Sequence, residues 1–152
     1  MALEFNTIGV KVKYCVETSA GTRPAAGYTE IPDIKGTPAI DFDPAKIQVT
    51  NLQDKFHRFI DGVISVGDDF PFTANTTANL ESVWASMCSA AATAWASGKS
   101  TWYEIYIPNW KSFFFAGKPS QLGIGAMNVD SVIESTLHVV PNQIAGWATS
   151  SS

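Results

Sequence analysis

The side chains best suited to chemistry are two histidines and two close pairs of aspartates. His57 and His138 have no second histidine, cysteine or carboxylate at the spacing of a zinc site. Asp68-Asp69 and Asp41-x-Asp43 lack the ligand-rich spacing of a calcium loop. These residues favour structural, turn and surface roles, and we expect no metal and no cofactor.

Motifs that carry out catalysis are also missing. The sequence contains no G-x-S-x-G elbow, no phosphate loop and no H-E-x-x-H helix. The stretch from Gly123 to Asn128 lacks the third glycine of a dinucleotide loop and precedes a predicted strand rather than a helix. No nucleophile–base pair is visible, so the chain is not expected to be an enzyme, and we name no catalytic or cofactor-binding residue.

The two cysteines, Cys15 and Cys88, leave two alternatives open. A disulfide between them is one; reduced thiols, usual in a cytoplasmic chain, are the other. Cys88 falls on the apolar face of a predicted helix, which favours buried packing.

Aromatic residues suggest a different kind of site. Trp102, Tyr103, Tyr106 and Trp110 lie on a predicted hairpin, and exposed rings of a β-sandwich can stack on sugars. Filling a core or a subunit interface is favoured, because no cluster of Asp, Asn and Arg accompanies these rings. A carbohydrate-binding β-sandwich is kept as the alternative from another class.

Composition predicts one globular domain that hides surface in an assembly. Of 152 residues, 45% are hydrophobic and only 16% are charged, against about 25% in an average protein. We expect residues 1–147 to form the domain and 148–152 a flexible tail. The formal net charge is −4 without basic clusters, so nucleic-acid binding is not indicated. The apolar stretch from Trp84 to Trp95 is too short for a membrane anchor, and without a secretion signal we expect synthesis in a cytoplasm.

Alternation of apolar and polar residues predicts seven or so strands. The third is expected to be interrupted by a turn at Asp61-Gly62, and the last to stop at Pro141. The expected strands are Val10–Val16, Ile47–Leu52, Phe56–Val66, Phe70–Ala74, Trp102–Ile107, Trp110–Ala116 and Val129–Val140.

One helix is expected from Leu80 to Ala96. Its apolar residues recur at helical spacing and include Trp84 and Trp95. Asn79 is the expected N-cap, and Gly98 ends the helix. The predicted class is mostly β (α+β), with the helix packed on a sheet.

A long segment from Thr18 to Lys46 is rich in proline and glycine, which excludes regular helix. Loops of this length are usually functional. Five apolar residues and one proline within it are expected to dock on a surface: Tyr28, Ile31, Pro32, Ile34, Ile40 and Phe42.

The order of these elements resembles the major tail tube proteins of long-tailed phages. The resemblance rests on Ile31–Pro38, on Ile47–Lys55, on Phe59–Gly62 and on Phe70–Asn75. It extends from about Val10 to Pro141. The similarity implies two packed antiparallel β-sheets, as a sandwich or half-barrel, flanked by one helix with a long loop after the first strand.

The same resemblance implies function. Six copies would form a ring, and rings would stack into a hollow tube that conducts DNA during ejection. The lumen would hold a tape-measure protein, and tail terminator and baseplate or distal tail proteins would close the ends. DNA would pass without specific binding. The long loop at 18–46 would be the self-assembly loop, and the protein would reside in the virion. A tube protein of a phage-like bacteriocin or secretion system is the alternative.

Overall fold

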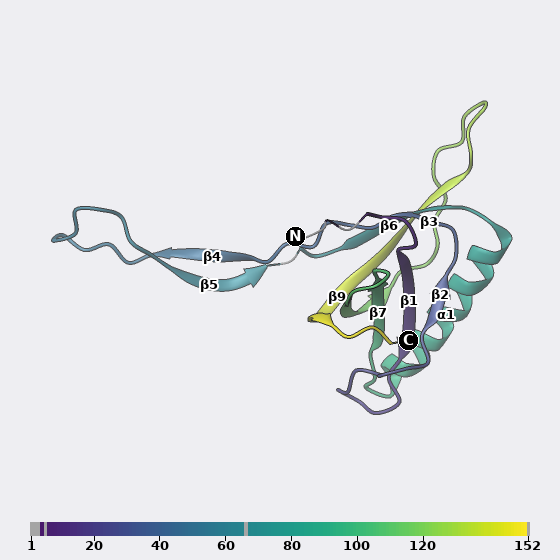
Figure 1. Ribbon diagram of the computed structural model, residues 1–152, viewed down its shortest axis with the longest axis horizontal. Coiled ribbons are helices and arrows are strands. Elements are labelled where there is room, and N and C mark those ends of the chain that lie inside the picture. The colour runs from purple at the N-terminus through teal and green to yellow at the C-terminus, as the bar shows by residue number, and fades with distance from the viewer. Residues whose placement is uncertain (1–3, 5, 66, 152) are drawn as a thin grey trace.

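The computed structural model describes residues 4, 6–65 and 67–151, and this part of the chain folds into nine strands and one helix (Figure 1). Seven strands form one antiparallel sheet, in the order β2-β1-β7-β8-β9-β6-β3, and β4 and β5 form a separate hairpin. The elements are β1 (Lys11–Val16), β2 (Thr29–Ile31), β3 (Ile34–Gly36), β4 (Asp43–Gln48), β5 (Phe59–Ser65), β6 (Phe70–Asn75), α1 (Ala78–Ala96), β7 (Thr101–Tyr106), β8 (Ser112–Pro119) and β9 (Glu134–Ala148).

The predicted class is confirmed: the fold is mostly β, with one helix and two antiparallel sheets. The arrangement of the sheets differs from the expected packed pair. Figure 1 shows the β4–β5 hairpin extending away from the large sheet instead of covering it. Among the described residues no second sheet packs on the large one, which buries its apolar face by curling and by packing on α1.

A two-residue link forces the large sheet to curl. β2 and β3 lie at opposite edges of the sheet, yet only Pro32 and Asp33 separate them along the chain. Because three residue steps span at most about 11 Å, the two edges must approach each other. The sheet is therefore nearly a closed barrel.

Asp33 fixes this corner. Its backbone has φ of 63°, a left-handed conformation that aspartate tolerates. Its carbonyl accepts a hydrogen bond from the Asn75 amide at 3.0 Å, and its carboxylate accepts one from the Thr77 hydroxyl at 2.6 Å. The corner is thereby joined to the end of β6 and to the start of α1.

The core lies between the concave face of the sheet and α1. Side chains alternate along β6 and along β9 as far as Val139, so that every second residue there is buried. Phe115 is central, with ring centroids 5.0 Å from Phe70 and 5.2 Å from Tyr103. The helix contributes Leu80, Trp84 and Met87 to the same cluster.

The helix agrees with its prediction in extent but not in its N-cap. Thr77 caps the helix, and its side chain accepts a hydrogen bond from the Leu80 amide at 3.1 Å. The choice of Asn79 was wrong because the chain becomes helical one residue before it, at Ala78. Trp95 was expected in the buried stripe, but half of it is exposed and the Lys118 ammonium lies 5.5 Å from its ring centroid.

The opposite face of the large sheet carries a second cluster, formed by Trp102, Phe114 and Ala116. Two buried carboxylates accompany it. Glu17 accepts a hydrogen bond from the Trp102 indole at 3.1 Å, and Glu104 accepts two from Ser151, at 2.6 and 3.0 Å. Ser151, in the tail that we expected to be flexible, therefore supplies hydrogen bonds to a buried carboxyl group.

The Thr18–Lys46 segment contains more structure than expected. It includes β2, β3 and the first residues of β4, so the long loop is divided into shorter connections. The predicted turn at Asp61-Gly62 is wrong as well. Asp61 pairs with Lys46 inside the hairpin, and Gly62 lies at a bulge where an added Cβ would be 3.1 Å from the Ala45 carbonyl oxygen.

Pro141 does not end the last strand. β9 continues to Ala148, while the residues from Val129 to Ile133 belong to the preceding loop. The proline is tolerated because it lies opposite Gly117 at a shift in the β8–β9 register. Its missing N–H therefore falls at an irregularity of the ladder.

Gly117 has no room for a side chain at this position. A Cβ there would lie 2.6 Å from the Val140 carbonyl oxygen and 2.7 Å from a Val139 methyl group. We expect Gly117→Ala to lower the free energy of unfolding by about 1–3 kcal/mol, measured by urea denaturation. Gly123→Ala is the control: no atom lies within 4 Å, so its effect should stay within about 1 kcal/mol. Equal stability of the two variants would contradict this account.

Candidate assembly surface

The β4–β5 hairpin and its connection, residues 43–65, form a projection that we call the arm (Figure 1). Eight of its large apolar side chains are exposed, and Leu52 at the tip is 106% exposed. The eight are Ile47, Val49, Leu52, Phe56, Phe59, Ile60, Val63 and Ile64. Contiguous apolar surface of this kind marks sites of protein association.

Both faces of the arm carry exposed apolar side chains. Ile47 pairs with Ile60 across the hairpin, so these side chains share one face. Phe59 lies on the other face, and the register shift at the bulge places Ile64 on that face as well. A two-stranded hairpin is at best marginally stable in water, and the described part of the chain covers neither face of this one. The arm therefore presents two surfaces that a neighbour could cover.

Polar contacts shape the end of the arm. The Arg58 guanidinium donates to Asp54 at 2.9 Å, and the Asp54 carboxylate also accepts the Asn51 amide at 2.9 Å. His57 lies 2.9 Å from the Gln48 amide nitrogen. His57 therefore has a local hydrogen-bond partner across the hairpin, consistent with a structural role.

The six residues predicted for self-assembly lie at the root of the arm and along the sheet edges that lead to it. Ile31 is buried in the core, Ile34 and Ile40 pack against the core, and Pro32 forms the corner. Tyr28 meets Phe114 edge-on at 5.8 Å, and burial raises the pKa of its phenol to about 12. Phe42 is half exposed, and its ring centroid lies 6.3 Å from that of Phe113.

The aromatic residues proposed for sugar stacking do not form an exposed platform. Trp102 and Tyr103 are only 1% and 0% exposed, so their faces are not available to a ligand. Tyr106 lies under the Lys13 ammonium at 4.6 Å. Trp110 packs on Trp147, which sequence reasoning had not singled out, with ring centroids 4.7 Å apart.

His138, Cys15 and Cys88 are engaged in local contacts. His138, on β9, lies 2.6 Å from the carboxylate of Asp69, the residue before β6, a pairing that sequence spacing did not reveal. Cys15 and Cys88 are free thiols, and burial raises the pKa of both. No cluster of three metal-ligating side chains occurs among the described residues. Within the same residues, no helix is long and apolar enough to cross a membrane.

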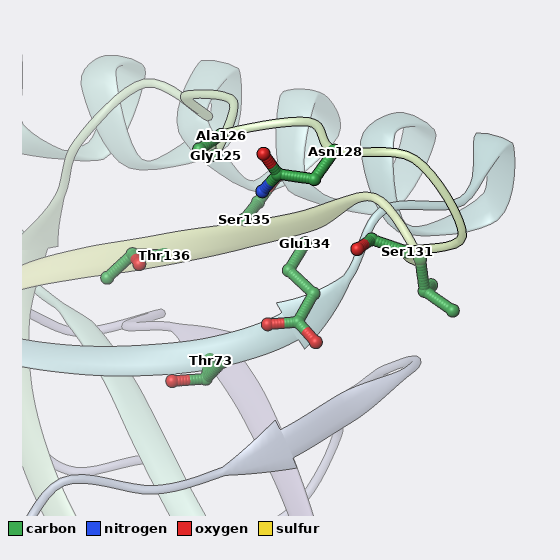
Figure 2. Close-up of a pocket in the computed structure, with 9 residues that line it drawn as sticks. Thr73, Gly125, Ala126, Asn128, Ser131, Glu134, Ser135 and Thr136 are labelled. Carbon is green, nitrogen blue, oxygen red and sulfur yellow. The ribbon is translucent and has the colours of Figure 1, made fainter.

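A hollow of about 420 Å³ lies where the loop before β9 passes over the sheet (Figure 2). Figure 2 shows Ala126 and Asn128 on the loop above β9, and Glu134 and Thr73 on the strands below. Glu134 forms an ion pair with Lys35. The other polar lining groups that the figure labels are hydroxyls and one amide, so the hollow suits hydrogen bonding more than acid–base chemistry.

One strand edge is also open. β9 pairs with β8 from Val139 to Ala148 on one side, but its pairing with β6 on the other side stops at Val139. In the described part of the chain, residues after Val139 therefore present unpaired backbone groups on that side. An edge of this kind is a template for a strand of another copy.

No protein-family model and no curated protein sequence matches the chain. Among solved structures, it is similar to a chain in the tail of an empty gene transfer agent particle with C6 symmetry: TM-score 0.59, 12% identity, 95% of this chain and 100% of that chain. A chain of the anti-feeding prophage baseplate, 6-fold symmetrised, gives TM-score 0.59, 8% identity and coverages of 96% and 97%. A chain of the native gene transfer agent virion gives TM-score 0.58 and 12% identity, and the match covers 95% of this chain and 100% of that chain. These likenesses show a shared fold over nearly the whole chain.

The arm should be the least protected part of an isolated subunit. Its hydrogen bonds join only two strands, whereas the large sheet has seven. We expect amides of residues 43–65 to exchange within seconds in dissociated protein, and amides of β8 to resist exchange for hours or longer. Assembly should slow exchange in the arm. Hydrogen–deuterium exchange with mass spectrometry measures this; equal protection of arm and β8 in the monomer would contradict it.

Proposed function

We propose that the chain is the repeating subunit of a phage tail tube, a structural protein with no reaction to catalyse. Copies join into six-membered rings, and the rings stack into a hollow tube through which DNA is ejected into the host. The observation that carries the proposal is the arm, whose apolar residues are exposed on both faces in a single chain. The shared fold with chains of tail particles of sixfold symmetry supports it.

The arm supplies enough apolar surface to drive association. Fully burying one Val, Leu, Ile or Phe side chain stabilises by about 1.5–3 kcal/mol. Association costs an estimated 4–15 kcal/mol in translational and rotational freedom. Eight exposed side chains on one arm are sufficient to offset that cost, even though several of them are half buried already.

In this proposal the residues at the root of the arm fix its position on the barrel. Ile34 and Ile40 anchor the chain to the core before β4 begins, and Phe42 lies against Phe113 on β8. The self-assembly segment at 18–46 therefore contributes by fixing where the arm leaves the barrel. The apolar contacts with a neighbour are made further along, by residues 47–64.

The open edge of β9 offers a contact within a ring. Strand pairing between neighbouring copies would satisfy the backbone groups after Val139 and join the sheets of six copies into one continuous barrel. Stacking of rings is a different, head-to-tail contact, which extends without limit.

The proposed partners follow from the tube. A tape-measure protein occupies the lumen, and tail terminator and baseplate or distal tail proteins bind the two ends. DNA passes without specific binding, since a formal net charge of −4 disfavours adhesion of a polyanion. The protein is made in the host bacterial cytoplasm and ends in the virion tail.

A tube protein of a phage-like bacteriocin or secretion system is the second candidate. The likeness to the anti-feeding prophage baseplate chain, with the same TM-score of 0.59, favours it specifically. Particles purified from the producing cells separate the two: the virion subunit copurifies with heads that contain DNA, and the alternative with headless tubes.

Two charges placed on the arm should abolish assembly without unfolding the subunit. Leu52 and Val63 are 106% and 83% exposed, so Leu52→Asp with Val63→Asp leaves the core intact. Wild-type protein is expected to form hollow rings and tubes in negative-stain electron microscopy. The double variant should remain monomeric by light scattering, because its carboxylates would be buried in the contact.

The matched control is Ile8→Asp, at a residue that is 81% exposed but lies outside the arm. It should assemble as the wild type does, and all three proteins should have similar melting temperatures. Wild-type protein that stays monomeric at every concentration would overturn the tube. Tubes formed normally by the double variant would overturn the role of the arm.

A further inference from the structure

The loop that connects β8 to β9, residues 120–133, carries the second concentration of exposed apolar side chains. Its five members are Ile124, Met127, Val129, Val132 and Ile133, and Val129 is 90% exposed. Together with the eight of the arm, they are 13 of the 19 large apolar side chains exposed in the described part of the chain. Exposed large apolar side chains are thus concentrated in two segments.

The 120–133 loop is held in place at both ends. The Trp84 indole donates to the Ser120 carbonyl at 2.8 Å, and the Ser135 hydroxyl donates to the Gly123 carbonyl at 3.0 Å. Gly125 donates its amide to the Glu134 carbonyl at 2.9 Å, a close approach that a Cβ would block. These contacts anchor the base of the loop, which lowers the entropy lost on binding.

The arm and the 120–133 loop project from different ends of the molecule. Figure 1 shows the arm extending to the left and the loop, coloured yellow-green, rising at the upper right. The two apolar surfaces cannot cover each other within one chain. Between copies they are complementary, because each is apolar and each projects beyond the barrel.

The tip of the arm and the 120–133 loop also carry opposite unpaired charges. From residue 119 to the end, the sequence contains no lysine or arginine, and its acids are Asp130 and Glu134. Glu134 pairs with Lys35, which leaves the exposed Asp130 as the charge of the loop. At the tip of the arm, Arg58 is paired with Asp54, which leaves the exposed Lys55. The free charges are opposite in sign.

We propose that the 120–133 loop of one copy receives the tip of the arm of the next copy, with Lys55 of the arm near Asp130 of the loop. This inference rests on the proposed function and adds the receiving surface to it. The contact joins two different surfaces, so every copy keeps one free arm and one free loop. Such a contact is heterologous and propagates along an assembly.

Single cysteines test the contact directly, in a background where Cys15→Ala and Cys88→Ala remove the native thiols. A bismaleimide of about 10 Å should link Lys55→Cys protein to Asp130→Cys protein when the two are mixed and assembled, and the product should be a dimer. Each protein alone should give no link, and a copy with both substitutions should give a ladder of multimers. Lys55→Cys mixed with Ser86→Cys, on the exposed face of α1, is the matched control and should stay unlinked.

Charge reversal tests the same contact with the native cysteines present. Lys55→Glu should raise the concentration needed for assembly several-fold, and adding Asp130→Lys should restore it. Val129→Asp should raise it roughly tenfold or more, since a carboxylate would be buried in the contact. Assembly with no effect of Val129→Asp, or links between two Lys55→Cys copies, would overturn the arm–loop contact while leaving the tube itself standing. Failure of the wild type to assemble would instead remove the proposed function.

Discussion

The two-residue corner between β2 and β3 is the constraint on which the rest of the structure depends. It brings the two edges of a seven-stranded sheet together, so the sheet curls around its core and leaves as edges two three-residue strands and the part of β9 after Val139. A barrel of this kind has little edge left for nonspecific pairing. Association can then use the open edge of β9 and what projects from the barrel. The arm does so because it is inserted between β3 and β6, two neighbours in the sheet.

Local signals predicted the parts of the fold that depend on nearby residues. The stripe from Leu80 to Met87 follows from helical periodicity, because it packs on one core. The hairpin of β7 and β8 follows from its run of aromatic residues, which are buried on both faces of the sheet, Phe115 in the main core and Phe114 in the second cluster. Asp61-Gly62 misled the prediction because the same dipeptide serves turns and bulges. Pro141 misled it because only the partner strand, with Gly117 opposite, shows that the ladder is irregular there.

The assembly surface could be predicted only in outline, for a related physical reason. Alternating apolar residues such as Ile47, Val49, Ile60 and Ile64 read as ordinary strands with a buried face, and the sequence does not say which molecule buries that face. The long segment from Thr18 to Lys46 attracted attention through its prolines and anchors. Most of those anchors dock on their own subunit, and the exposed residues lie further on. Pairings such as His138 with Asp69 depend on strand register, which spacing along the chain does not contain.

The arm combines exposed apolar side chains with charges that are mostly matched inside the arm itself. Six of the residues from 43 to 65 are charged, a larger share than the 16% of the whole chain. Arg58 is paired with Asp54, and Lys46 lies directly opposite Asp61 in the hairpin, an arrangement that favours opposite charges. A charge that a neighbour covers has to be desolvated, at a cost larger than the gain from most surface ion pairs. Matching charges within the arm lowers that cost when a neighbour covers its apolar side chains, and the exposed Lys55 remains at the tip to set orientation.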